Sequence, residues 1–164
     1  MKVLVFGSAG TGKSFITQTL RLEGINAWDA DDIEGLSAWF DIEGNQVEAP
    51  ASAFEALENH YAFLWNKSFL SRLLDLHHHF YLFGGSGNVF DVLDLFDRVY
   101  CLTVDPEIQR QRLLERAASD PGRNRFDDSP VIWGQWLEKE ARIRHIACID
   151  GTLTPKQIWE IIRQ

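Results

Sequence analysis

A loop of eight residues near the start of the sequence constrains the fold more than any other feature. Residues 7–14 have the sequence GSAGTGKS, which fits the pattern G-x-x-x-x-G-K-S of a phosphate-binding loop. The apolar run at residues 2–6 is typical of a strand, and Phe15, Ile16 and Leu20 recur at helical spacing after the loop. Because this strand, loop and helix are the context that the motif requires, we predict that the loop binds a nucleoside triphosphate.

The residue types in the loop suit this chemistry. Its glycines permit backbone conformations that direct successive N–H groups at one anion, and the N-terminus of the following helix adds partial positive charge. Lys13 is expected to reach the β- and γ-phosphates, and the hydroxyl of Ser14 to bind Mg²⁺. The alternative is a glycine-rich turn that binds no phosphate. The predicted nucleotide-binding residues of this region are Gly7, Ser8, Ala9, Gly10, Thr11, Gly12, Lys13, Ser14 and Thr17.

Composition bounds the class of protein and its partners. The 164 residues are 45% hydrophobic, which suits one globular domain over residues 1–164, and the formal net charge is −8. An acidic chain without a basic run is a poor candidate for binding nucleic acid or an anionic membrane, so we expect neither partner. No apolar run reaches the length of a membrane span. Cys101 and Cys148 lie in apolar runs typical of buried strands, which favours reduced thiols in a cytoplasmic protein. The protein is expected to be a monomer or a homodimer.

Two carboxylates follow the second predicted strand, at residues 25–28. Ligands of open α/β sheets bind at the carboxyl ends of the strands, so Asp29 and Asp31 are expected to face the same crevice as the phosphate loop. If the strand continues, both side chains point the same way. One carboxylate then serves Mg²⁺ and the other a substrate hydroxyl. The alternative is a cluster that caps a helix, for which Asp32 is the better candidate.

The middle of the chain carries an insert and a second glycine turn. Residues 33–66 are interpreted as a substrate-side insert, irregular or with a small hairpin, and residues 53–60 and 65–76 as helices. The third strand, at residues 80–83, ends at Gly84 and Gly85, where a substrate is able to approach the backbone closely. An ordinary strand-to-helix turn is the alternative.

The last third of the chain alternates helices and strands again. Helices are predicted at residues 89–96, from residue 106 onward, at 131–144 and at 156–163, and strands at 97–104 and 145–149. Residues 117–130 are rich in turn formers and are interpreted as a lid. Four arginines within this segment or shortly before it are suited to triphosphate oxygens, and the two on the preceding helix are expected to point outward. The alternative is a solvated helix face with Glu107, Glu115 and Asp120 as the partners of these arginines. The predicted lid arginines are Arg112, Arg116, Arg123 and Arg125.

The order of elements predicts an α/β fold of three layers. Five strands that alternate with helices form a parallel sheet with helices on both faces, and the strand before the phosphate loop is expected at its centre.

On these residues the chain resembles the small P-loop kinases, the group of the adenylate, shikimate and gluconate kinases. The resemblance covers most of the chain and rests on residues 7–14, on Asp29 and Asp31, on the turn at Gly84 and Gly85, and on the arginines. It implies a P-loop NTPase fold with strand order 2-3-1-4-5. It also implies that Asp29 serves Mg²⁺, that Asp31 contacts the substrate hydroxyl, and that Gly84 and Gly85 contact substrate. The loop after the fifth strand is implied to lie near adenine, namely Asp150, Gly151 and Thr152.

The chain departs from these kinases on the acceptor side. Residues 35–60 contain no lysine or arginine, and Trp39, Asp41, Glu43 and Glu48 are there instead, which argues against an anionic acceptor such as shikimate. The expected function is therefore phosphoryl transfer from ATP, assisted by Mg²⁺, to a neutral or cationic hydroxyl compound. Lys13, Asp31 and the four arginines are the expected catalytic residues. The alternative is an ATP- or GTP-binding switch that acts through a protein partner.

Overall fold

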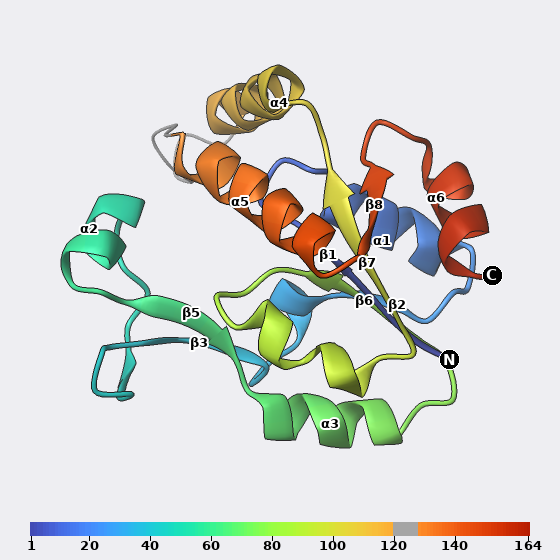
Figure 1. Ribbon diagram of the computed structural model, residues 1–164, viewed down its shortest axis with the longest axis horizontal. Coiled ribbons are helices and arrows are strands. Elements are labelled where there is room, and N and C mark those ends of the chain that lie inside the picture. Colours follow the sequence, from blue (N-terminus) through green and yellow to red (C-terminus); the bar gives the residue numbers. More distant parts are fainter. Residues whose placement is uncertain (120–127) are drawn as a thin grey trace.

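A five-stranded parallel sheet lies at the centre of the computed structural model, which describes residues 1–119 and 128–164 (Figure 1). Its strands lie in the order β2 (Ala27–Asp29), β6 (Phe80–Gly84), β1 (Lys2–Phe6), β7 (Arg98–Thr103) and β8 (Ala147–Asp150). Counted along the chain, these five strands have the order 2-3-1-4-5. The predicted α/β class, the strand order and the central position of the first strand are confirmed.

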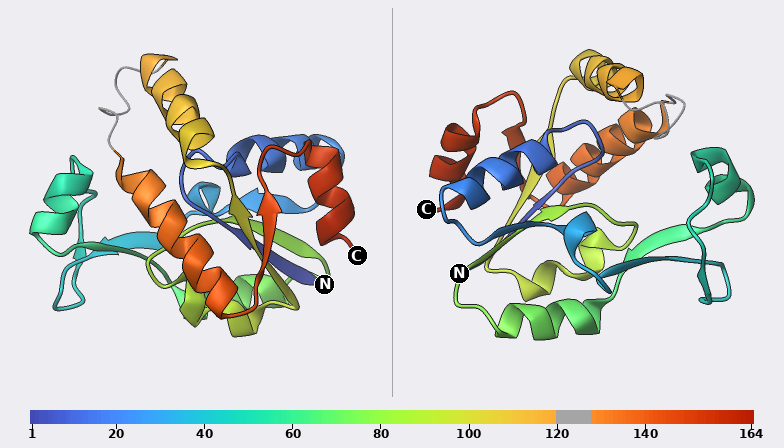
Figure 2. Two further views of the ribbon diagram at one scale, coloured as in Figure 1. Left: turned by 45° about the horizontal axis from the view of Figure 1, so that its top comes forward. Right: turned by 180° about the vertical axis from the view of Figure 1, so that it is seen from behind.

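Two apolar cores lie on opposite faces of this sheet, because successive side chains of a strand alternate between faces. Val3 and Val5 pack on one face, where α1 (Lys13–Leu22) and α6 (Pro155–Ile162) cover them. Leu4 and Phe6 pack on the other, beneath α3 (Lys67–Asp75) and α5 (Ser129–Ile143). The helices thus form layers above and below the sheet (Figures 1 and 2).

A second, antiparallel sheet projects from this body, visible at the left of Figure 1. It has the order β4 (Gln46–Val47), β3 (Ser37–Phe40) and β5 (Ala62–Trp65), with α2 (Ala53–Glu58) between β4 and β5. We call residues 37–65 the arm. The hairpin alternative for the insert is confirmed and extended, whereas the prediction of a helix from residue 65 is wrong at its start. Residues 62–65 form a strand because they pair with β3, an interaction that helical spacing does not reveal.

The side-chain amide of Asn88 fastens the arm to the loop after β6. Its Oδ1 accepts a hydrogen bond from Trp65 N at 2.9 Å, and its Nδ2 donates to Trp65 O at 3.0 Å. Gly87 N donates to Phe63 O at 2.7 Å. The inner strand of the arm is therefore held against the carboxyl end of the parallel sheet.

Three short 3₁₀ helices replace regular elements that the sequence predicts. η2 (Val89–Asp91) and η3 (Leu93–Leu95) stand where one helix was expected at residues 89–96. η1 (Ala30–Asp32) begins directly after β2, and the carboxylate of Asp29 caps it by accepting from Asp31 N at 3.2 Å. The strand therefore does not continue through Asp31, and the prediction that Asp32 is the cap is wrong.

Helix α4 (Pro106–Ser119) extends further than predicted. Residues 117–119, assigned to the lid from the sequence, belong to this helix, and α5 begins at Ser129. Arg123 and Arg125 lie outside the described residues, so their predicted roles are not tested. No helix in the two described ranges combines the length and the apolar character needed to cross a membrane.

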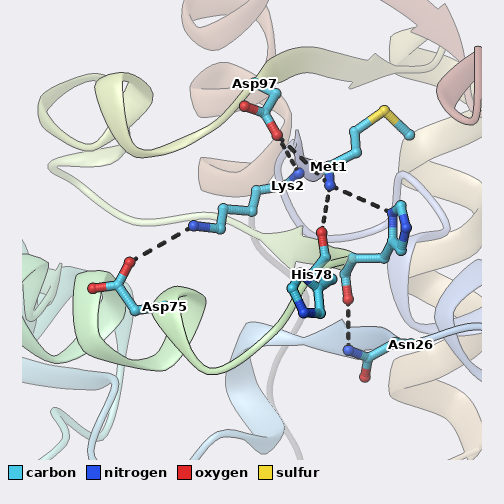
Figure 3. Close-up of polar contacts among 7 residues, drawn as sticks. Met1, Lys2, Asn26, Asp75, His78 and Asp97 are labelled. Carbon is cyan, nitrogen blue, oxygen red and sulfur yellow. Dashed lines mark hydrogen bonds and ion pairs between the residues drawn. The ribbon is translucent and has the colours of Figure 1, made fainter.

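Polar contacts hold the amino end of β1 at the edge of the sheet that lies away from the phosphate loop (Figure 3). Met1 N donates to His78 O, and Lys2 N donates to Asp97 Oδ2 at 2.6 Å. Lys2 Nζ lies 3.7 Å from Asp75 Oδ1. These contacts fix β1 between β6 and β7, and with it the position of the loop at its other end.

Candidate nucleotide and acceptor site

The phosphate loop joins the end of β1 to the start of α1. Gly7 N donates to Gly84 O at 3.0 Å, which joins the loop to the end of β6. Gly12 caps α1 with φ of 103°, a left-handed conformation that favours glycine, and Gly10 has φ of 83°. The glycines at positions 10 and 12 thus give the loop the turns with which it enters the helix.

Lys13 lies over the loop and is half-buried. Its Nζ donates to Gly7 O and Ser8 O, each at 2.8 Å, while Thr11 Oγ1 donates to Ser8 O at 2.9 Å. Burial lowers the pKa of the Lys13 ammonium from 10.5 to about 8, although the nearby carboxylates of Asp29 and Asp31 oppose the shift. Because the protein solvates this ammonium poorly, phosphate oxygens bound beside it would stabilise its charged form.

Ser14 and Asp29 meet beside the loop. Ser14 Oγ donates to Asp29 Oδ2 at 2.6 Å, and Asp29 is buried at the end of β2. A hydroxyl and a carboxylate are oxygen ligands of the type that Mg²⁺ takes in small number, alongside phosphate and water. No group of three His, Cys, Asp or Glu side chains gathers for a metal within the described residues. The pair at Ser14 and Asp29 therefore fits Mg²⁺ held together with a triphosphate.

A cavity of about 530 Å³ surrounds the loop. Thr17 lies at its wall, and its Oγ1 donates to Lys13 O at 2.8 Å, so this hydroxyl supports the helix rather than facing the cavity as a free donor. The walls combine the loop, the start of α1 and the arginines. The lining residues used below are Lys13, Ser14, Arg21, Asp29, Asp31, Asp32, Phe63, Gly85, Arg112, Arg116 and Trp133.

Arg112 lies on the inner face of α4, contrary to the solvated-face alternative. Its Nη1 donates to Gly10 O at 3.4 Å and Thr11 O at 3.3 Å, and both Nη1 and Nη2 donate to Gly151 O at 3.3 Å. The guanidinium therefore connects the phosphate loop to the turn after β8. Asp150 and Thr152 in that turn are exposed and bond to each other, so of the three predicted residues only Gly151 packs on the loop.

Arg116 also lines the cavity, one helical turn after Arg112. It is exposed, and no hydrogen bond or ion pair of its guanidinium is found in the described part of the chain. Its charge contributes to lowering the pKa of Lys13. Of the two predicted arginines that lie within the described residues, Arg116 is thus the one whose positive charge remains available to a ligand.

A second cavity of about 630 Å³ opens between the parallel sheet and the arm. η1 and the residues after it form one wall, β3 and β5 of the arm another, and α5 contributes Trp133. Ser37 lies in this wall, and its Oγ is buried and has no hydrogen-bond partner among the described residues. The lining residues are Asp31, Ile33, Glu34, Gly35, Ser37, Trp39, Phe63, Gly85 and Trp133.

Asp31 stands where the two cavities meet. It lines both, as do Phe63, Gly85 and Trp133. The pKa of its carboxyl is raised because the surrounding protein removes part of its hydration, with a further contribution from the Asp29 carboxylate; the Lys13 ammonium opposes the rise. A carboxylate with a raised pKa is a better proton acceptor than an ordinary aspartate.

The glycine turn after β6 keeps this junction open. A Cβ on Gly85 would stand 2.9 Å from Trp133 Cη2 and 2.8 Å from Gly7 O. A Cβ on Gly84 would stand 2.5 Å from Ala30 Cβ and 2.8 Å from Trp65 Cζ2. Gly85 therefore lines the junction, and its predicted contact with substrate stays a prediction, whereas Gly84 is buried beneath Trp65 and lines neither cavity.

Several residues of the site were not identified as such from the sequence. Phe63 lies on a strand that was assigned to the space between two helices, and Trp133 was assigned only to the apolar side of a helix. Residues 62–65 form a short, continuous apolar run, which is a sequence signal for a strand. Glu34 carries no sequence signal, because its place in the cavity wall depends on contacts between separate elements.

Comparisons with known proteins agree with this fold. No family model matches the sequence, and no curated protein matches it. Among solved structures, a sugar kinase from Janibacter sp. HTCC2649 is 19% identical with a TM-score of 0.53, over 97% of this chain and 90% of that chain. Shikimate kinase from Acinetobacter baumannii, solved with shikimate, is 16% identical with a TM-score of 0.52, over 98% and 91%.

A gluconokinase from Sinorhizobium meliloti 1021 is 11% identical with a TM-score of 0.50, over 96% of this chain and 86% of that chain. At identities this low, structural similarity shows a shared fold but not a shared reaction or substrate. The chemistry has to be argued from the residues of the site. The chain has the fold of the P-loop small-molecule kinases.

Proposed function

We propose that the protein transfers the γ-phosphoryl group of ATP to a hydroxyl group of a small molecule, with the help of Mg²⁺. The observation that carries the proposal is the meeting of the two cavities at Asp31. One cavity has the lysine, hydroxyl and arginines suited to a triphosphate, and the other is large enough for a small organic acceptor. A transferred group needs such a junction, because donor and acceptor must lie in line.

In the proposed reaction the acceptor hydroxyl lies against Asp31. Its oxygen bonds to the γ-phosphorus as the bond from that phosphorus to the bridging β,γ-oxygen breaks, and ADP leaves. The hydroxyl proton passes to the Asp31 carboxylate, whose raised pKa favours its acceptance. Asp31 thereby both orients the acceptor and takes its proton.

The cations around the loop act on the phosphates. Lys13 exchanges its bonds to Gly7 O and Ser8 O for phosphate oxygens, and Arg116 adds a second positive charge on the side of α4. Ser14 and Asp29 would hold Mg²⁺, which would supply positive charge to neutralise the triphosphate. Most of the rate enhancement then comes from positioning and electrostatic stabilisation.

The test begins with the acceptor, which the sequence does not identify. A thermal-shift screen uses protein saturated with Mg²⁺ and a non-hydrolysable ATP analogue, across hydroxyl compounds, and ADP release from ATP is then measured with each hit. We expect a compound that raises the melting temperature further and releases ADP. Stabilisation by nucleotide alone, with no compound adding to it, would favour the switch alternative.

Asp31→Asn then separates the two functions. We expect the turnover of the identified acceptor to fall by about 10²- to 10⁴-fold while nucleotide affinity is retained, because the amide takes no proton. Asp75→Asn is the matched control, since Asp75 lies at the distant edge of the sheet beside Lys2. Unchanged turnover in Asp31→Asn would reject the mechanism.

A further inference from the structure

The two cavities differ in the charges that line them, because the nucleotide cavity has basic and acidic side chains and the acceptor cavity has carboxylates alone among the described residues. The basic side chains Lys13, Arg21, Arg112 and Arg116 line the nucleotide cavity. The charged side chains that line the acceptor cavity are the carboxylates of Asp31 and Glu34, and no lysine or arginine of the described residues joins them. The acceptor cavity is therefore acidic, although it adjoins a basic phosphate site.

Aromatic rings make up much of the remaining wall. Trp39 and Phe63 pair across β3 and β5, with ring centroids 5.4 Å apart and planes inclined by 49°. Trp133 lines the cavity from α5, next to Gly85. The negative faces of indole and phenyl rings attract organic cations, most strongly where a carboxylate stands nearby and water is displaced.

We propose that the phosphoryl acceptor is a hydroxyl-bearing organic cation whose ammonium group binds between Glu34 and the rings of Trp39, Phe63 and Trp133. This inference rests on the proposed function and names the substrate class of that site. The hydroxyl lies at Asp31, towards the triphosphate, and the ammonium lies further from it. An anionic acceptor would meet Asp31 and Glu34 with no lysine or arginine among the described lining residues to compensate, so like-charge repulsion disfavours it.

The size of the cavity restricts the acceptor further. A volume of about 630 Å³ exceeds what a two-carbon amino alcohol fills. An acceptor with an apolar or ring portion beside its ammonium group uses this space against the aromatic walls.

A pair of isosteric probes tests the charge preference by binding alone. The cation is benzyl(2-hydroxyethyl)dimethylammonium, and 3,3-dimethyl-4-phenylbutan-1-ol is its neutral counterpart with carbon in place of nitrogen. Titration calorimetry with protein saturated by Mg²⁺ and a non-hydrolysable ATP analogue gives both affinities. We expect the cation to bind at least about tenfold more tightly, with a preference that declines as salt is raised.

Variants locate the preference at Glu34. Glu34→Gln should reduce it at least about threefold, and Glu34→Lys should abolish it. Glu34 is exposed, so both variants are expected to fold. Glu43→Gln is the matched control, since Glu43 is an exposed carboxylate of the arm that does not line the cavity and should leave the preference unchanged. Equal affinities, a preference that survives in Glu34→Gln, or no binding of either probe at millimolar concentration would each overturn the inference.

These outcomes are distinguishable from failure of the proposed function. Phosphorylation of neutral hydroxyl compounds, without a charge preference, would keep the kinase and overturn the cationic acceptor. A Glu34-dependent preference for the cation, in a protein that releases no ADP with any hydroxyl compound, would keep the cation site and reject the kinase.

Discussion

The side-chain amide of Gln109 donates a hydrogen bond to the hydroxyl of Ser8, with 2.7 Å between Nε2 and Oγ. Gln109 is the buried residue of α4, and its Nε2 also lies 2.7 Å from Ala9 O and 3.2 Å from Pro130 O. A Cβ on Gly134 would stand 2.6 Å from Ser8 Oγ, so a glycine there allows α5 to approach. One side chain thus connects the phosphate loop with α4 and the start of α5.

Gln109→Leu is expected to lower the free energy of unfolding by about 1–3 kcal/mol, because the buried hydroxyl of Ser8 and the partly buried carbonyl of Ala9 lose their hydrogen bonds to it. It should also weaken nucleotide binding, since the loop loses its connection to α4. Urea unfolding and calorimetric titration with an ATP analogue measure the two effects.

Gln111→Leu provides the control on the same helix. Gln111 is exposed, and its Nε2 bonds to Glu115 Oε1 at 3.0 Å, so its replacement should change stability by less than about 0.5 kcal/mol. Equal effects of the two substitutions would show that Gln109 has no special role.

Asp29→Asn tests the magnesium site. The amide retains the shape of the side chain but loses the charge that would face Mg²⁺ beside Ser14. We expect the gain in ATP affinity that Mg²⁺ brings to fall by about tenfold or more, while affinity in the presence of EDTA changes little. Titrations with and without Mg²⁺ measure this, and an unaltered Mg²⁺ effect would place the metal elsewhere.

Gly151→Ala tests the contact between the turn after β8 and the phosphate loop. The added Cβ would stand 2.4 Å from Thr11 O and 2.9 Å from Val104 Cγ1, so the backbone must move. We expect a loss of stability of about 1–3 kcal/mol and weaker nucleotide binding. Gly44→Ala is the control, in the exposed turn of the arm, where an added Cβ would meet no atom within 4 Å beyond its neighbours in the chain. Its φ of 85° makes the substitution strained, but nucleotide affinity should stay unchanged.

The sequence predicts the central part of the fold well because local signals there agree with the final structure. The apolar strands, the glycine loop and the helix caps are encoded within short segments, so the sheet order and the phosphate loop follow from pattern and topology. Arg112 shows the limit of this reasoning. Helical periodicity places it on the helix, but which side of α4 faces the loop depends on Gln109 and on contacts over a hundred residues away.

The acceptor side was predicted less completely for the same reason. β5 exists because it pairs with β3, and Asn88 holds it through the backbone of Trp65, both of which are interactions between separate segments. The sequence has no lysine or arginine over residues 35–60, and none of the described residues that line the acceptor cavity is basic. The ring of Trp133, contributed from α5, was not predictable without the packing of α5 beside Gly85.

Lys13→Met tests the burial of the loop lysine through pH. Below pH 8 the ammonium is protonated in the folded and unfolded states alike. Between about 8, its pKa in the folded protein, and 10.5, its ordinary pKa, the unfolded chain binds more protons, so this group makes the folded protein more stable as pH rises. The thiol groups of Cys101 and Cys148, whose pKa values are raised by burial, act in the opposite direction over this range. The effect of Lys13 is therefore read from the difference in the free energy of unfolding between the parent protein and Lys13→Met. The cysteine contributions are the same in both proteins and cancel.

We expect the parent protein to gain stability relative to Lys13→Met by up to about 3 kcal/mol as pH is raised from 7.5 to about 10.5. Urea unfolding of both proteins at several pH values, in EDTA and without nucleotide, measures this difference. The variant also loses the bonds from Lys13 Nζ to Gly7 O and Ser8 O, which changes the stability difference by a constant amount while the ammonium stays charged. The test is therefore how the stability difference changes with pH, not its absolute size. A difference that stays constant across this range would mean that the Lys13 ammonium is as well solvated in the folded protein as in the unfolded chain.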